Sequence, residues 1–199
     1  MKKVMILFCC LLCVCLNAQN PNLKKGKIGI TFTPVGYCGI SYFGKGGGSE
    51  GNLYGLGINY IYLLNKRLEL ETGIEYSKYH IIQSPYLDLK YETNLYLINI
   101  PLSLRINFLK FFFFNTGIFI DIDFAKNNDI ENQTGLGLML LGLGAKYDFK
   151  SGVSLFANPF VRWHSVISFQ GLYHERLVDA GVRFGITYNL KNERKINYE

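Results

Sequence analysis

Outside its first 15 residues the sequence contains a single cysteine, Cys38, and this scarcity excludes a disulfide framework. The other four cysteines lie at positions 9, 10, 13 and 15. Long apolar runs are also missing after residue 19. Residues 136–145 form an apolar stretch, but a membrane-spanning helix needs roughly 20 such residues. We therefore expect neither covalent cross-links nor a spanning helix in the main part of the chain.

Clustered positive charge is absent as well. The formal net charge of +6 falls to +4 without the lysines at positions 2 and 3, and the remaining basic residues are dispersed except for Lys191, Arg194 and Lys195. A nucleic-acid-binding surface needs a clustered basic stripe, so no nucleic-acid partner is expected. The basic tail is solvated or lies near phosphate head groups. Zinc motifs, a nucleophile elbow and a dinucleotide fingerprint are missing too, and we expect no cofactor, no metal site and no catalytic residues.

The first 19 residues have the organisation of a secretory signal peptide. Two lysines precede an apolar stretch at residues 4–16, and a short cleavage region follows it. We predict cleavage after Ala18 or Gln19. The signal at residues 1–19 is then followed by one domain, residues 20–190, and by a short tail, residues 191–199.

Two alternatives remain for this leader. A membrane-anchoring helix is the first, although the apolar stretch is short for a span. A lipoprotein with a lipidated Cys13 or Cys15 is the second, although the preceding residues, Leu12 and Val14, are not small.

The connectors between the apolar segments alternate in length. Longer loops are expected at residues 44–52, 81–91, 125–134 and 165–175, and tight turns at residues 65–66, 109–110 and 150–151. The segments between them alternate apolar and polar residues with a period of two, as half-buried strands do. This rhythm predicts an all-β fold, an eight-stranded antiparallel up-and-down barrel with one looped end and one smooth end. Transmembrane β-barrels of the outer-membrane type are built in this way.

Within this pattern the strand at residues 96–108 alternates most cleanly. It places Tyr96, Ile98 and Ile100 on one face and Asn99 and Arg105 on the other. The eight predicted strands lie near residues 27–43, 53–64, 67–80, 96–108, 111–124, 136–149, 152–164 and 176–190.

Two strands carry signs of a bulge. In the first strand Pro34 and Gly36 suggest a bend, and we expect Ile28 and Ile40 on the same apolar face. The sixth strand changes phase near residues 139–140, which a β-bulge would explain.

Side-chain volume indicates which face is outside. An eight-stranded barrel holds only a modest layer of side chains, whereas most strands carry five or more bulky residues on the apolar face. The other face mixes glycines with charges and fits a narrow interior. Lipid must therefore cover the apolar face, and a closed barrel satisfies the backbone within it. Aromatic residues near both strand ends form the two expected interfacial girdles: Tyr42, Tyr54 and Tyr76 at the loops, and Tyr62, Phe108, Phe112, Tyr147, Phe149 and Tyr188 at the turns.

Ionisable residues of the glycine-rich face would share the barrel lumen. Buried charges persist when they are paired and hydrogen-bonded, so we expect a structural salt-bridge network that plugs the barrel. A narrow polar pathway for protons or small ions is the alternative. The predicted network consists of Glu69, Glu71, Glu75, Arg105, Asp121, Asp123, Lys146, Arg162, Asp179 and Arg183.

Other residues suggest chemistry only weakly. Glu69 and Glu71 are two positions apart and simply share a face, so they imply no acid–base pair. The three histidines fall at or near the looped end, where His164 and Ser165 raise the alternative of a lipid A-modifying hydrolase. The acidic loop at residues 125–134 lacks the spacing of a calcium-binding loop.

The strand Tyr96-Leu-Ile-Asn-Ile-Pro-Leu-Ser-Leu-Arg-Ile-Asn-Phe108 resembles a strand of the PorT-like outer-membrane β-barrel family, with its Leu-x-Ile-Pro-Leu pattern followed by a basic residue. Shorter similarities lie at residues 115–117, 142–149 and 181–190. The resemblance implies an outer-membrane barrel, and in some members an association with secretion or gliding machinery. The residues after position 190 depart from the usual aromatic end of such barrels.

We therefore expect a non-enzymatic, monomeric outer-membrane barrel with periplasmic termini and external loops that serve a structural, ligand-binding or partner-binding role. The expected partners are outer-membrane lipid, the barrel-insertion machinery during biogenesis, and envelope or secretion proteins. An accessory subunit of a secretion or gliding complex, a narrow pore and a lipid A-modifying hydrolase remain the alternative functions.

Overall fold

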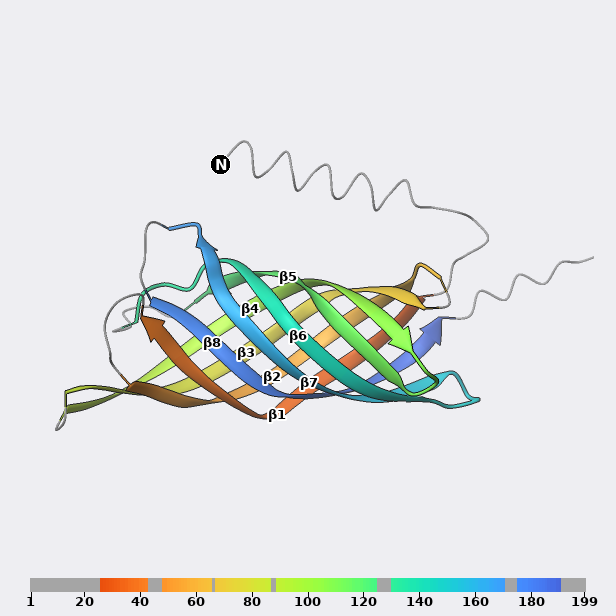
Figure 1. The fold of residues 1–199 in the computed structure, drawn as a ribbon, viewed down its shortest axis with the longest axis horizontal. Helices are drawn as coiled ribbons and strands as arrows, with labels where there is room; N and C mark the ends of the chain where they lie inside the picture. Colours follow the sequence, from red (N-terminus) through yellow and green to blue (C-terminus); the bar gives the residue numbers. More distant parts are fainter. Residues whose placement is uncertain are drawn as a thin grey trace, which may run out of the picture.

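The chain forms a closed barrel of eight antiparallel strands, as the computed structural model shows (Figure 1). The structure describes residues 26–42, 48–65, 67–86, 89–124, 130–170 and 175–190. The predicted signal and the predicted tail lie outside them. No helix among these residues is long and apolar enough to cross a membrane. The strands are β1 (Gly26–Tyr42), β2 (Gly48–Leu63), β3 (Leu68–Tyr86), β4 (Leu89–Phe108), β5 (Phe112–Asp123), β6 (Gly135–Asp148), β7 (Val153–Ser168) and β8 (Glu175–Leu190).

Each strand pairs with its neighbours in sequence, and β1 pairs with β8 to close the ring. Gly26 lies opposite both Tyr62 of β2 and Leu190 of β8, so the chain enters and leaves the barrel at the end with the short turns. The prediction of an eight-stranded up-and-down barrel is confirmed. Closure pairs the first and last strands, which leaves the sheet without an open edge.

Individual residues stabilise two of the short turns. The Asn65 side chain accepts hydrogen bonds from the backbone N–H groups of Arg67 and Leu68, both at 2.8 Å, and so closes the β2–β3 turn. Gly152 has a φ of 89° in the β6–β7 turn, a conformation that glycine adopts without a Cβ clash.

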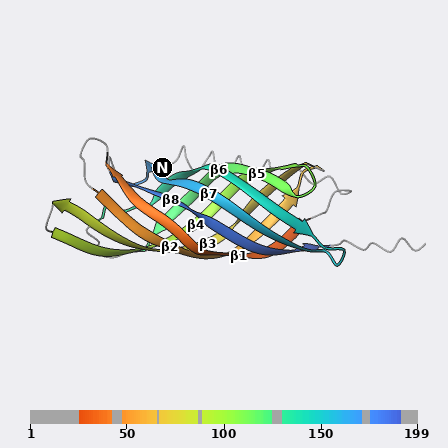
Figure 2. The same cartoon turned by 60° about the horizontal axis from the view of Figure 1, so that its bottom comes forward.

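The looped end differs from the prediction. Residues 81–91 are mostly strand, because β3 and β4 continue to pair as far as Tyr86 and Leu89. This hairpin projects beyond the other strands (Figures 1 and 2). Similarly, β2 begins at Gly48 and β7 continues to Ser168, which shortens the loops expected at residues 44–52 and 165–175. The period-two pattern persists past the expected strand ends, and the ladders follow it.

The outer surface is apolar around the barrel, as the volume argument predicts. Ile30, Ile58 and Ile186 have about 60% of their surface exposed, at 61%, 61% and 59%, whereas their inward neighbours Thr31 and Asn59 are 4% exposed. The outward apolar residues of all eight strands form a continuous belt, which includes Ile28, Ile30, Phe32, Leu56, Ile58, Ile74, Ile106, Ile122, Leu141, Leu143, Leu155, Phe184 and Ile186.

Bulges change which residues face the lumen. In β6 an extra residue between Met139 and Gly142 leaves Leu140 and Leu141 both facing outward, as the predicted bulge requires. In β1 the register with β8 shifts between Phe32 and Val35, and the strand changes phase. The expectation for Ile40 is therefore wrong. Its side chain is buried inside the barrel, because one added residue moves every later side chain to the opposite face.

Candidate functional site: the plugged lumen

Charged side chains cross the lumen at the middle of the barrel. The Glu71 carboxylate, fully buried on β3, receives hydrogen bonds from Arg105 at 2.6 Å and from Asn59 at 2.9 Å. Arg183 of β8 approaches the same carboxylate at 3.3 Å from the opposite wall and donates to Asn158. One carboxylate thus connects β2, β3, β4 and β8 through the barrel interior.

A second group of charges lies toward the turn end. Glu69 lies 3.5 Å from Lys146 and 3.8 Å from Lys27, and the Lys27 ammonium also reaches Asp148 at 3.3 Å. Asp148 further accepts a hydrogen bond from Ser154. These contacts join β1, β3, β6 and β7 at the rim, where the Asp148 side chain is 45% exposed.

A third group fills the lumen closer to the loops. Arg162 donates to Asp179 at 2.8 Å and to Glu75 at 2.8 Å. Asp179 also accepts from the Tyr79 hydroxyl at 2.8 Å. The fully buried His164 ring lies beside the same carboxylate.

His164 is held between two acids. Its Nδ1 lies 3.0 Å from Asp121 and its Nε2 lies 3.1 Å from Asp179. A carboxylate oxygen accepts and does not donate, so the arrangement fits an imidazolium that carries a hydrogen on both nitrogens. With that charge on His164, the negative and positive charges of the three lumen groups are equal in number. The acids are Glu69, Glu71, Glu75, Asp121, Asp148 and Asp179, and the cations are Lys27, Arg105, Lys146, Arg162, Arg183 and His164.

Four phenylalanines interleave with these charges, and each is paired with a glycine of the neighbouring strand. Phe113 lies opposite Gly144, and an added Cβ there would stand 2.1 Å from the ring. The other pairs are Phe119 with Gly137, Phe156 with Gly185, and Phe160 with Gly181. Because each glycine has no side chain, the ring of its cross-strand partner can occupy the space that a second side chain would fill.

The rings also contact the guanidinium groups. Arg105 lies 4.2 Å from the ring centroid of Phe113 and 4.9 Å from that of Phe156, and Arg162 lies 4.5 Å from Phe160. A cation over an aromatic face is attracted by the ring quadrupole. The plug is therefore bonded both through ion pairs and through aromatic contacts.

An apolar layer closes the lumen at the looped end, which the sequence analysis did not anticipate. Leu53, Ile81, Leu95, Leu97 and Leu177 have no exposed surface. They form one cluster with Cys38, Ile40, Tyr79, Ile130 and Phe160.

The segment after residue 130 folds against this layer. The buried Gln133 side chain donates to the backbone carbonyl of Glu131 at 2.8 Å and accepts from the Leu177 N–H at 3.1 Å. The loop is thereby attached to the start of β8 above the apolar cluster.

The structure brings nine of the ten predicted residues together in the three lumen groups. Asp123 is the exception, since it lies half-buried at the mouth and accepts a hydrogen bond from the Gln133 backbone at 3.0 Å. Sequence reasoning omitted Lys27, Tyr79, Asp148 and His164 from the network. The period of two along a strand could have identified two of them. Lys27 falls on the same face as Gly29 and Thr31, and His164 falls on the same face as Arg162.

The alternative sites have a different environment from the one expected. His164 is inside the barrel rather than at the outer rim, because a carboxylate faces each of its ring nitrogens. Ser165 is 1% exposed, and no His164–Ser165 hydrogen bond occurs among the described residues. His174 and residues 125–129 of the acidic loop lie outside those residues. Within the described ranges no group of His, Cys, Asp and Glu side chains could hold a metal ion.

No protein-family model matches the chain, and neither does any curated protein. Solved structures do resemble it. The outer membrane protein AlkL, determined in lipid bilayers, has 13% identity and a TM-score of 0.55, over 86% of this chain and 92% of that chain. Neisserial surface protein A has 14% identity and a TM-score of 0.50, over 81% and 96%. The outer membrane protein OprG from Pseudomonas aeruginosa has 13% identity and a TM-score of 0.50, over 84% and 96%.

At these identities the likeness concerns the fold alone. The chain has the fold of the eight-stranded outer-membrane β-barrels, and the particular PorT-like resemblance is not shown by any match.

Proposed function

We propose that the protein is an integral outer-membrane barrel whose closed body is a scaffold and whose looped end meets a ligand or partner. The observation that carries this proposal is the apolar belt on all eight strands, combined with a charged and glycine-rich interior. A soluble barrel would need the reverse arrangement. In a bilayer the belt is covered by lipid and the backbone is satisfied by closure.

The contents of the lumen favour a plug over a pore. Ion pairs between non-adjacent strands cross it at three levels, from β3 to Lys146, Arg183 and Arg162, and the leucine and isoleucine layer lies above them. An ion would have to displace buried salt bridges and then cross an apolar constriction. Eight strands leave little open cross-section in any case.

A binding role at the looped end is supported by the projecting β3–β4 hairpin (Figure 2). We place the loops outside the cell and the termini in the periplasm, following the signal predicted at the N-terminus. The PorT-like resemblance favours a partner within a secretion or gliding complex as the second candidate. We further propose that the protein is not an enzyme, because the His164 ring is committed to Asp121 and Asp179.

Membrane insertion tests the main proposal. Purified protein is folded into phospholipid vesicles, floated on a density gradient and run on a gel with and without boiling. We expect co-flotation and a heat-dependent change in migration, as a closed barrel gives. Protein that pellets or migrates identically in both lanes would contradict the membrane assignment.

Partner binding needs a separate experiment in the native envelope. A photo-crosslinking residue replaces Ile82 on the projecting hairpin, and the matched control places it at Ile58 on the belt. We expect a discrete protein adduct from position 82 only. Equal adducts at both positions, or none at position 82, would contradict a partner site on the hairpin.

The absence of enzymatic activity is tested through lipid A. If the composition of lipid A changes when His164 is replaced, the proposal that the protein is not an enzyme is contradicted.

A further inference from the structure

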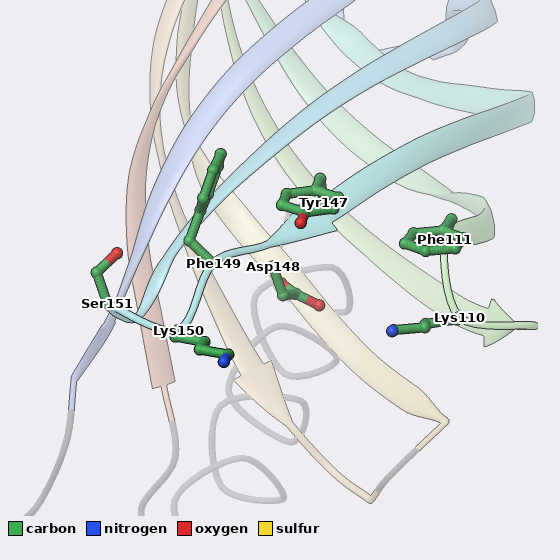
Figure 3. A pocket seen from close by; sticks show the side chains of 7 residues that line it. All are labelled: Lys110, Phe111, Tyr147, Asp148, Phe149, Lys150 and Ser151. Atoms are coloured by element: carbon green, nitrogen blue, oxygen red, sulfur yellow. The ribbon is translucent and has the colours of Figure 1, made fainter.

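A groove lies on the outside of the barrel at the turn end, between the β4–β5 and β6–β7 turns (Figure 3). Its volume is about 600 Å³. Lys110 and Phe111 line one side, while Tyr147, Phe149 and Lys150 line the other. Asp148 also lines the groove, and it is the lining residue that belongs to the lumen network.

Three aromatic rings form the floor of the groove. Phe111 and Tyr147 are parallel, with ring centroids 6.2 Å apart and an interplanar angle of 2°. Phe149 meets Tyr147 edge-on at 4.8 Å. All three are exposed, and they stand at the turn-end edge of the apolar belt. Tyr147 is on β6, as is Leu143, and lies opposite Leu155 of β7. Aromatic residues at such an edge lie at the depth of the lipid glycerol and head groups.

The charge around this floor is positive. Lys110 lies 5.3 Å from the ring centroid of Phe111. Among the residues described by the structure, no carboxylate forms an ion pair with Lys110 or Lys150. Asp148 is the acid in the groove wall, and its carboxylate is engaged by Lys27 at 3.3 Å and by Ser154. Two uncompensated ammonium groups therefore flank an apolar floor.

We propose that this groove binds the phosphate head group of a glycerophospholipid in the leaflet that faces the turn end. The ammonium groups of Lys110 and Lys150 contact the phosphate, and the rings of Phe111, Tyr147 and Phe149 pack on the glycerol and the first acyl carbons. Free phosphate would use only the lysines and leave the aromatic floor uncovered. The proposal rests on the membrane insertion proposed above.

The test compares lipid binding by native mass spectrometry of the detergent-purified protein. The probe is dioleoylphosphatidylglycerol, with dioleoylglycerol as the analogue that lacks phosphate. The groove variant is Lys110→Gln/Lys150→Gln. The control variant, Arg67→Gln/Lys78→Gln, also removes two exposed positive charges, but from outside the groove.

We expect one retained phosphatidylglycerol on the wild type and on the control. Because the variant loses both ammonium groups that contact the phosphate, it should bind the lipid on the order of ten-fold or more weakly. Dioleoylglycerol should bind poorly, and inorganic phosphate at equal concentration should not displace the lipid.

Several outcomes overturn the proposal: no retained lipid on the wild type, equal retention by both variants, equal binding of dioleoylglycerol, or displacement by inorganic phosphate. Flotation and heat-dependent migration of the same samples report membrane insertion separately. A barrel that inserts normally but retains no lipid would remove this site and leave the proposed function intact.

Discussion

Replacing Glu71 with glutamine tests whether the lumen network holds the barrel together. Glu71→Gln preserves the shape of the side chain and removes its charge. Arg105, now 2.6 Å from the carboxylate, then keeps its contacts with Phe113 and Phe156 but has Glu69, at 3.9 Å, as its remaining carboxylate partner. Arg183 keeps its hydrogen bond to the Asn158 amide and loses its carboxylate partner. Two guanidinium groups are thereby left in the barrel interior with little compensation.

The expected loss follows from this geometry. Removing one partner of a buried ion pair costs about 3–5 kcal/mol, because the other charge remains desolvated. We expect the free energy of unfolding to fall by that amount, which corresponds to roughly a hundred-fold to several thousand-fold change in the unfolding equilibrium.

Reversible urea unfolding from phospholipid vesicles measures the change, with fluorescence of Trp163, the single tryptophan, as the signal. Glu50→Gln is the control, since Glu50 is exposed on β2, and it should stay within about 0.5 kcal/mol of wild type. Glu71→Gln/Arg183→Met should recover part of the loss by removing one unpaired guanidinium. If Glu71→Gln lowers the free energy of unfolding by less than about 1 kcal/mol, the reasoning is refuted, because a neutral amide would then stabilise the two guanidinium groups nearly as well as the carboxylate does.

Three further changes probe the belt, the packing of the sheet and the apolar layer. Ile58→Arg should destabilise the inserted barrel by about 2–4 kcal/mol in the same urea assay, and a neutral result would mean that lipid does not cover Ile58. Gly73→Ala should destabilise the barrel by about 1–3 kcal/mol, since the added Cβ would lie 2.2 Å from the Ile58 carbonyl oxygen. A variant that migrates and unfolds like the wild type would contradict that contact. Cys38 should resist maleimide labelling in folded vesicles and react after denaturation, because it is 7% exposed within the apolar layer; rapid labelling of the folded protein would contradict a closed lumen.

Local sequence patterns were sufficient for much of the architecture. In β4, Tyr96, Ile98 and Arg105 take the faces that alternation assigns them, and the phase change near Met139 marks a real bulge. These features depend on the period of two within one strand. They need no knowledge of the neighbouring strand.

The register between neighbouring strands could not be predicted from the sequence. The pairing of Phe113 with Gly144 follows from which residue of β5 faces which residue of β6, and a single extra residue changes that choice. Ile40 shows the consequence, because the bulge in β1 moved it from the expected lipid face to the lumen.

The amino-acid sequence by itself determined the strand number, the apolar outer face and the identity of most charges inside, because these depend on composition, periodicity and the volume of the lumen. The tertiary structure decided which charges meet. It placed His164 between Asp121 and Asp179, which are distant in sequence, and it sealed the looped end with Leu53, Leu95 and Leu177. The contact of His164 with Asp179 depends on the register between the paired strands β7 and β8. The apolar cluster depends on closure of the sheet, which brings side chains of β2, β4 and β8 into one narrow interior.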